Sequence, residues 1–233
     1  EHSTRDSINV IPCANEASLL LAFLDKWIEI DPTIVIHWNG DNFDIPYLYN
    51  RINKLAGKQY ADSLSPINEV IYLKHRNRYR IMGVSCLDYM ALYKLFTYSE
   101  EVSYSLDAIS KKELGKGKIE YEGTLDHLYK TDAEKFVKYN INDVELVVEL
   151  DEKLKFLELA RGICHKGHVP YEDVYFTTRY LDGACITYMK RLGIVAPNRK
   201  LKDHSQTAEE EAESNEFAGA FVKDPIPGLY EWI

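Results

Sequence analysis

The spacing of hydrophobic residues along the chain predicts an alternation of helices and strands. Between residues 15 and 30, apolar side chains recur every three or four positions, which is typical of one face of an amphipathic helix. A run of β-branched residues within 33–38 predicts a short buried strand, and polar residues at 39–42 interrupt it. A second helical pattern follows and ends near Gly57. This order of helix, strand, loop and helix is typical of an α/β fold.

Residues 69–87 carry a different pattern. Two short apolar-rich runs, at 70–73 and 79–82, flank a polar segment, which predicts a β-hairpin. The basic residues of this hairpin, with no acidic residue between them, are Lys74, Arg76, Arg78 and Arg80. Such a loop could contact phosphates, and the alternative interpretation is a solvated hairpin tip.

The rest of the hydrophobic pattern predicts further helices, at 87–97, 105–114, 132–160 and 171–192. The longest of them is expected to begin with a capping box made by Thr131 and Glu134 and to stop at Gly162. Residues 198–216 are polar and hold several glutamates close together, which is typical of a flexible linker.

Composition narrows the class of protein. The chain has 233 residues, of which 45% are hydrophobic, and this excludes collagen-like and wholly disordered proteins. Its longest apolar run is too short to cross a bilayer. The four cysteines are scattered without metal-ligand spacing, which favours reduced thiols in a reducing compartment. A net charge of −9 argues mildly against coating of nucleic acid but not against an enzyme that gathers carboxylates around metal ions.

Asp143 lies on the apolar stripe of the longest predicted helix, one turn after Tyr139. A carboxylate that faces a core is costly unless it is paired, neutralised or bound to a metal ion. Helix geometry leaves two interpretations open: a partly exposed aspartate at the edge of the stripe, or a functional site. A tyrosine one turn earlier, able to hydrogen-bond a shared ligand, slightly favours a site.

Asp44 lies where the predicted strand has ended and the next helix begins. An aspartate before Ile-Pro is typical of a helix N-cap with proline in the first turn. Catalytic groups also often follow the carboxyl end of a strand in an open α/β sheet. The two interpretations do not exclude each other, and both stay open at this point.

Four motifs, in order, resemble those of family B DNA polymerases. Residues 37–47 resemble the second exonuclease motif, which is built on Asn, Phe or Tyr, and Asp, and residues 139–143 resemble the third, Tyr-x-x-x-Asp. Between them, 105–109 is similar to the family's single-strand motif and 118–121 to its Lys-x-x-hydrophobic motif. Each motif is weak alone, whereas four in the right order and spacing are a strong signal.

The resemblance covers nearly the whole chain and implies a domain arrangement. The sequence at 44–52 is similar to that of polymerases of T-even-like tailed phages, and 218–227 resembles the start of the polymerase palm. The implied fold is an α/β, RNase H-like (DnaQ-like) exonuclease fold that lacks its first strands and carries an inserted hairpin. The implied segments are a partial exonuclease domain at 1–160 with its hairpin at 69–87, a helical connection at 161–197, a flexible acidic linker at 198–216 and the start of the palm at 217–233.

The resemblance also implies a chemistry, the removal of mispaired 3′ nucleotides by hydrolysis with two divalent ions, Mg²⁺ or Mn²⁺. Asp44 and Asp143 would bind metal, Tyr139 would orient the attacking water, and Lys118 would contact the phosphate or help to order the site. The residues implied to hold the single-stranded 3′ end are Asn39, Phe43, Ser105 and Leu106. For Phe43 and Leu106, packing in the core is an equally good interpretation.

We therefore expect part of a replicative DNA-directed DNA polymerase, in the cytoplasm of the bacterial host if a phage encodes it. The expected partners are the primer 3′ end, the remaining polymerase segments and, in the full-length protein, a sliding clamp, with no membrane. The family's first motif, Asp-x-Glu, does not occur before Asp44, so we expect negligible nuclease activity from this chain alone. The alternative is a non-catalytic DNA-binding or assembly piece of a split polymerase.

Overall fold

The structure, a computed structural model, describes residues 8–74, 77–197 and 228. Contacts divide the chain into two units, 1–193 and 194–233, and the helices and strands that the structure describes all lie in the first. The linker predicted at 198–216 lies outside the described residues. So does the palm segment predicted at 217–233, apart from Gly228.

A parallel pair of strands lies at the centre of the first unit. β1 (Ile34–His37) pairs with β4 (Ser85–Asp88), and the register sets His37 opposite Asp88. The sequence analysis missed β4 and began a helix at residue 87, which is wrong. The sequence Ser-Cys-Leu-Asp has no β-branched residue, so its extended conformation comes from pairing with β1 rather than from local preference.

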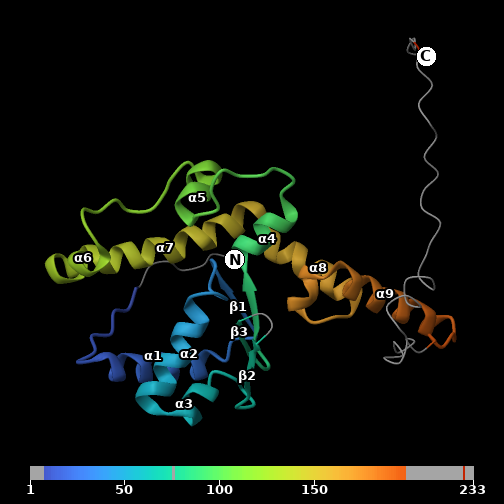
Figure 1. Ribbon diagram of the computed structural model, residues 1–233, viewed down its shortest axis with the longest axis horizontal. Helices are drawn as coiled ribbons and strands as arrows, with labels where there is room; N and C mark the ends of the chain where they lie inside the picture. The colour runs from blue at the N-terminus through green and yellow to red at the C-terminus, as the bar shows by residue number, and fades with distance from the viewer. Residues whose placement is uncertain (1–7, 75–76, 198–227, 229–233) are drawn as a thin grey trace. The chain divides into compact units, whose positions relative to one another are not determined.

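Helices cover both faces of this strand pair, as Figure 1 shows. Alternation along β1 turns Ile34 and Ile36 towards one core and Val35 towards the other. The first core is built mainly from α4 (Tyr89–Phe96), α5 (Leu106–Leu114), α7 (Ala133–Leu154) and α8 (Phe156–Gly167). The second is built mainly from α1 (Glu16–Ile30), α2 (Asp44–Ala56) and α3 (Lys58–Asp62). The described chain is therefore a mixed α/β structure.

A second pair of strands packs against the second core. β2 (Val70–Leu73) runs antiparallel to β3 (Arg78–Ile81), with Val70 opposite Ile81. Ile81 is buried, and it anchors the base of this pair between α2 and the central strands. The tip, near Asn77, extends away from the buried residue.

Smaller elements complete the unit. α6 (Leu125–Thr131) packs on α7, while the 3₁₀ turn η2 (Tyr171–Tyr175) and α9 (Thr177–Arg191) pack on α8. The helix predicted at 171–192 is thus a 3₁₀ turn followed by a separate helix. Among the described residues, no helix has the length and apolarity that a membrane span requires.

The prediction of a single long helix at 132–160 is wrong, because the helix is interrupted at Lys155, between α7 and α8. This residue adopts a left-handed conformation, with φ of 58°, and α8 then continues through Gly162. Asp151 stabilises the break, since its Oδ1 accepts hydrogen bonds from the Leu157 N–H and the Tyr89 hydroxyl, each at 3.0 Å. No proline or glycine marks the position, so the apolar spacing hides it.

The expected capping box at the start of α7 is also wrong. Thr131 is the last residue of α6, and the N-cap of α7 is Asp132, whose Oδ1 accepts the Lys135 N–H at 2.9 Å. Asp132 takes the capping position because Thr131 still belongs to α6, where its hydroxyl donates to the His127 carbonyl.

Replacement of Lys155 by glycine should stabilise the protein. A left-handed L-residue costs about 1–2 kcal/mol, part of which is offset by the greater unfolded-state entropy of glycine, so we expect a net gain below about 1 kcal/mol. The control is Arg161→Gly, at an exposed position within α8, which should lower stability by about 1 kcal/mol. Urea unfolding followed by circular dichroism measures both, and a loss of stability in Lys155→Gly would contradict the prediction.

Candidate active site

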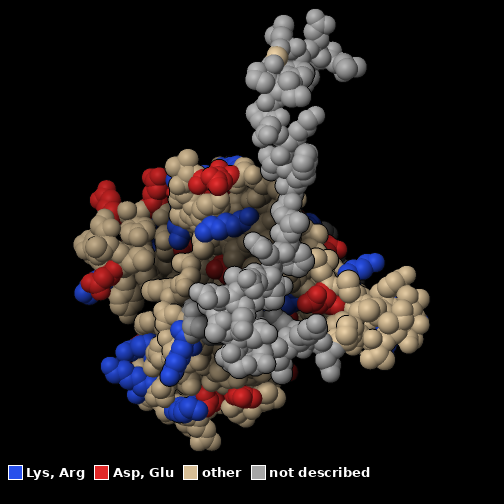
Figure 2. Space-filling view, turned by 45° about the vertical axis from the view of Figure 1, so that its right-hand side comes forward, with Lys and Arg blue, Asp and Glu red and all other residues tan. Residues whose placement is uncertain are grey.

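One cleft gathers the side chains of all four sequence motifs. It has a volume of about 860 Å³ and lies between the end of β1, the first turns of α2 and α5, and the middle of α7. Figure 2 shows a hollow in one face of the molecule, with an acidic side chain visible inside it. The motif residues that line the cleft are Asn39, Phe43, Asp44, Ser105, Leu106, Lys118, Tyr139 and Asp143.

Lys118, Tyr139 and Asp143 form a connected polar cluster in this cleft. Lys118 Nζ lies 2.6 Å from Asp143 Oδ2 and 3.1 Å from the Tyr139 hydroxyl oxygen. Burial lowers the pKa of Lys118, but hydrogen bonds with Asp143 and Tyr139 outweigh it and raise the pKa above its ordinary value. The ammonium is therefore charged at neutral pH and compensates the aspartate, instead of being solvated as a lone lysine.

Asp143 keeps one oxygen without a partner. Its Oδ1 is buried and accepts no hydrogen bond, while Oδ2 contacts Lys118. The side chain is 24% exposed and lines the cleft, so Asp143 is a partly exposed aspartate that also faces the candidate site. A buried acceptor with no donor is costly, and this is the arrangement that a bound cation would stabilise.

Asp44 is the first residue of α2 and is not its N-cap. The N-cap is Phe43, which makes no side-chain capping bond. The carbonyl of Gly40 instead accepts the N–H groups of Phe43, at 3.2 Å, and Ile45, at 3.0 Å. The N-cap interpretation of Asp44 is therefore wrong, because a loop carbonyl takes that role and leaves the Asp44 carboxylate on the wall of the cleft.

Asp88, at the end of β4, stabilises the loop at 38–43 through a hydrogen bond. Asp88 Oδ1 accepts the Asn39 N–H at 2.8 Å and also the Met90 N–H at 3.0 Å, where it caps α4. Asn39 has a left-handed φ of 60°, and the Gly40 N–H donates to His37 Nδ1 at 2.9 Å. The sequence analysis did not single out Asp88, although an aspartate before a helical pattern is a detectable capping signal.

Phe43 and Leu106, for which packing in the core was an alternative to a role in the site, have different surroundings. Phe43 is 66% exposed and stacks on Tyr47, with 6.2 Å between ring centroids, so core packing is wrong for Phe43. Leu106 is 7% exposed and belongs to the core of α5 and α7, although it also reaches the wall of the cleft. Ser105 caps α5, since its hydroxyl accepts the Ala108 N–H at 3.2 Å.

Asp107 orders the loop that presents Lys118, and the sequence analysis missed it. Its Oδ1 accepts the Lys118 backbone N–H at 2.9 Å, and its Oδ2 accepts from Lys111 Nζ at 2.7 Å. The hydrogen bond with Lys111 lowers the pKa of Asp107. A Cβ on Gly117 would overlap the Asp107 carboxylate, so only glycine permits this approach.

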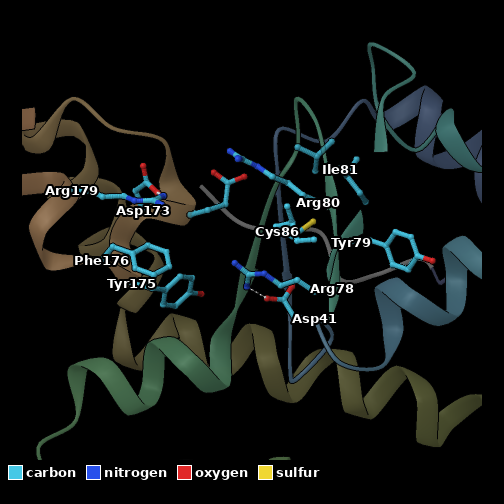
Figure 3. Close-up of a pocket in the computed structure, with 13 residues that line it drawn as sticks. Asp41, Arg78, Tyr79, Arg80, Ile81, Cys86, Asp173, Tyr175, Phe176 and Arg179 are labelled. Atoms are coloured by element: carbon cyan, nitrogen blue, oxygen red, sulfur yellow. Dashed lines mark hydrogen bonds and ion pairs between the residues drawn. The ribbon is translucent and has the colours of Figure 1, made fainter. Parts of the chain in front are cut away.

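The basic residues of the predicted hairpin that the structure describes do not line the cleft, and their surroundings differ from one another. Lys74 and Arg80 are exposed, whereas Arg78 donates to Asp41 Oδ2 at 2.7 Å, as Figure 3 shows. Arg78 is therefore paired with an acidic residue distant in sequence. Arg76 lies outside the described residues.

Known proteins are similar to this chain in sequence. Residues 1–109 match the family model described as DNA polymerase family B, exonuclease domain. The DNA-directed DNA polymerase of Escherichia phage RB69 is 33% identical over 98% of the chain, and that of Enterobacteria phage T4 is 31% identical over 98%. Over residues 1–109 the chain therefore matches the exonuclease domain of DNA polymerase family B. It spans about a quarter of the length of these two relatives, 25% of each.

The similar DNA polymerases are not confined to phages. DNA polymerase 1 of Saccharolobus solfataricus is 28% identical over 97% of the chain, which covers 26% of that protein. The DNA polymerase of Bombyx mori nuclear polyhedrosis virus is 27% identical over 78% of the chain, or 20% of its own length. Lys118, Tyr139 and Asp143 lie beyond the matched residues 1–109, within the region that the phage relatives cover.

The carboxylates of the cleft fit an oxygen-ligated divalent ion only in part. Asp44 and Asp143 line one cleft, and carboxylate oxygens are the ligands that Mg²⁺ and Mn²⁺ prefer. The unpartnered Asp143 Oδ1 suits a cation. Within the described ranges, however, no group of three or more acidic, histidine or cysteine side chains could hold a metal ion.

Replacement of Gly40 by alanine should distort the loop that carries Asn39. A Cβ at Gly40 would lie 2.5 Å from His37 Cγ, so we expect a loss of about 1–3 kcal/mol in the free energy of unfolding. The control is Gly162→Ala within α8, where nothing lies within 4 Å, and it should stabilise by about 0.5–1 kcal/mol. Equal effects of the two changes on urea unfolding would contradict the prediction.

Removal of the Asp107 carboxylate should free the Lys118 loop. In Asp107→Ala the Lys118 amide loses its acceptor, and we expect its hydrogen exchange to quicken about tenfold. Asp107→Asn keeps an oxygen for that N–H and should exchange like the wild type, as should Lys111→Ala, which removes only the ion pair. Amide exchange read by NMR tests the series; an Asn variant as fast as the Ala variant would show that the hydrogen bond is not what orders the loop.

Proposed function

We propose that this chain carries the proofreading 3′–5′ exonuclease region of a replicative DNA-directed DNA polymerase, with an RNase H-like fold and an inserted hairpin at 69–87. The observation that supports it best is that four motifs from separate parts of the sequence line one cleft, with Asp44 and Asp143 on its walls. The polymerases of phages RB69 and T4, named as DNA-directed DNA polymerases, support the wider assignment.

The substrate is the single-stranded 3′ end of DNA. Exposed Phe43 offers an aromatic face on which a base can stack, and such stacking tolerates any base. Asn39 and Ser105 offer polar contacts on the same cleft, while Leu106 and Val144 give it an apolar wall. A cleft of about 860 Å³ is large enough for more than one nucleotide.

Asp44 and Asp143 would hold the divalent ions, Mg²⁺ or Mn²⁺. When bound, such ions activate water as the nucleophile and stabilise the attacking and leaving oxygens. The Tyr139 hydroxyl, which Lys118 holds at 3.1 Å, orients the attacking water. Lys118 brings a positive charge to the phosphate, and the Lys118 loop is ordered by Asp107.

The wider arrangement is part of the same proposal. Residues 1–160 form a partial exonuclease domain, and 161–197, which include α9, form a helical connection. The exposed hairpin residues Lys74 and Arg80 contact DNA phosphates. The remaining polymerase segments and, in the full-length protein, a sliding clamp are the protein partners, in the cytoplasm of the bacterial host.

A second candidate is a non-catalytic DNA-binding or assembly piece of a split polymerase. The observation that favours it is the metal site. Four acidic side chains line the cleft, those of Asp44, Asp143, Asp151 and Glu152, but no three of the described His, Cys, Asp or Glu side chains are grouped so that they could hold a metal ion. On either candidate, the chain alone should show negligible nuclease activity.

Asp143→Asn should weaken Mn²⁺ binding to the 233-residue chain at least tenfold, because it removes a charged ligand and leaves Lys118 unpaired. The free Mn²⁺ signal in electron paramagnetic resonance measures this. The matched control is Asp126→Asn on α6, an exposed aspartate paired with Lys130, which should bind Mn²⁺ like the wild type. Equal Mn²⁺ binding by the wild type, Asp143→Asn and Asp126→Asn would contradict the assignment of Asp143 as a metal ligand.

A nuclease assay on a 5′-labelled oligonucleotide separates the candidates. No degradation by the chain alone, with cleavage restored when it is mixed with the preceding polymerase segment, supports the exonuclease region. Oligonucleotide binding without cleavage in the mixture favours the non-catalytic piece. Robust degradation by the chain alone that vanishes in Asp143→Ala would contradict the expected inactivity.

A further inference from the structure

An ion pair connects the hairpin to the loop after β1. Arg78, the first residue of β3, donates from Nη1 to Asp41 Oδ2 at 2.7 Å. The side chains are 27% and 16% exposed, so solvent and salt screen this pair less than an ion pair on the open surface. Asp41 and Arg78 are 37 positions apart in the sequence, and their contact is one of tertiary structure.

The other side of Asp41 faces the end of β1. His37 is 9% exposed, and its Nδ1 accepts the Gly40 N–H, so its Nε2 is directed at Asp41 Oδ1, 3.5 Å away. Burial raises the pKa of Asp41, but contacts with His37 and Arg78 outweigh it and hold the pKa below its ordinary value. One charged carboxylate thus contacts both the end of β1 and the start of β3.

The loop at 38–43 has two sides with different surroundings. Asn39 and Phe43, with Asp44 directly after them, line the cleft of the candidate active site. Asp41 lines a different cavity, of about 180 Å³, between the hairpin and the η2–α9 segment. Figure 3 shows Asp41 and Arg78 facing each other there, with Tyr175 and Phe176 on the opposite wall.

We propose that Asp41 is a positioning residue whose ion pair with Arg78 couples the hairpin to the loop that carries Asn39, Phe43 and Asp44. In this arrangement Arg78 serves the loop and is not a free phosphate contact. A phosphate that binds Arg78 has to compete with Asp41, so occupation of the hairpin by DNA changes how firmly the loop is held. Only this consequence for DNA rests on the proposed function; the coupling itself does not.

Hydrogen exchange tests the coupling without DNA. The amides of Asn42, Phe43 and Ile45 donate to carbonyls of Asn39 and Gly40, so their exchange reports on the loop. In Arg78→Gln we expect exchange at these amides to quicken about tenfold, while Arg78→Lys restores most of the protection. Asp41→Asn should quicken exchange at least as much as Arg78→Gln, because it also weakens the contact with His37. The double variant should not exceed Asp41→Asn, because both changes remove the same ion pair.

The matched control is Arg80→Gln, an exposed arginine two residues further along the same strand. It should leave exchange in the loop at the wild-type rate. Amides in the middle of α7 serve as an internal reference for global stability. The coupling is overturned if Arg78→Gln exchanges like the wild type, if Arg80→Gln has the same effect, or if the loop and α7 quicken together.

Binding of trithymidylate tests the consequence for the cleft. We expect Arg78→Gln to weaken its binding about threefold to tenfold, whereas Arg161→Gln, at an exposed position within α8, should bind like the wild type. Equal affinities of Arg78→Gln and the wild type would show that the coupling does not reach the cleft. If the wild type itself fails to bind trithymidylate, the proposed function fails, while hydrogen exchange still decides the coupling.

Discussion

The candidate site depends on one buried carboxylate, that of Asp88. It lies at the end of β4, opposite His37 in the parallel register, and is 6% exposed. Its Oδ1 accepts the N–H of Asn39 from the loop and that of Met90 from the first turn of α4, while its backbone carbonyl accepts the Tyr175 hydroxyl at 3.1 Å. Because a buried carboxylate needs donors, the loop and α4 meet at this strand end, and the backbone carbonyl of the same residue holds η2 there.

Charge in the cleft is balanced by the chain's own residues. Asp143 is an acidic side chain on a mostly apolar helix stripe, and the ammonium of Lys118 compensates it at 2.6 Å. Lys118 in turn depends on Asp107, which fixes the backbone of its loop. The two oxygens of Asp143 have different surroundings, since Oδ2 contacts Lys118 and Oδ1 has no partner. A cation that binds Oδ1, as proposed, therefore need not displace Lys118 from Oδ2.

Prediction from sequence succeeded where the signal was local and failed where a contact was distant. Helix positions such as α1 followed from apolar spacing, and the resemblance identified side chains that line one cleft. β4 escaped because its four residues have no strand preference of their own, and the break at Lys155 escaped because Asp151 stabilises it through Tyr89, 62 positions away. The roles of Asp107 and Asp88 were missed because each carboxylate accepts a hydrogen bond from a distant backbone N–H. Nearly every residue type has a backbone N–H, so the sequence does not show which one is the donor.

The sequence by itself determined the match to the family B exonuclease domain, the helix-forming stretches and the residue types available to the cleft, since these depend on composition, order and short-range spacing. Only the tertiary structure decided which of those residues are free. Phe43 is exposed while Leu106 is buried, and Arg78 is taken by Asp41 while Arg80 is not. The reason is physical: burial and pairing depend on which chain segments pack together, and two arginines in one strand look alike until a carboxylate from another element reaches one of them.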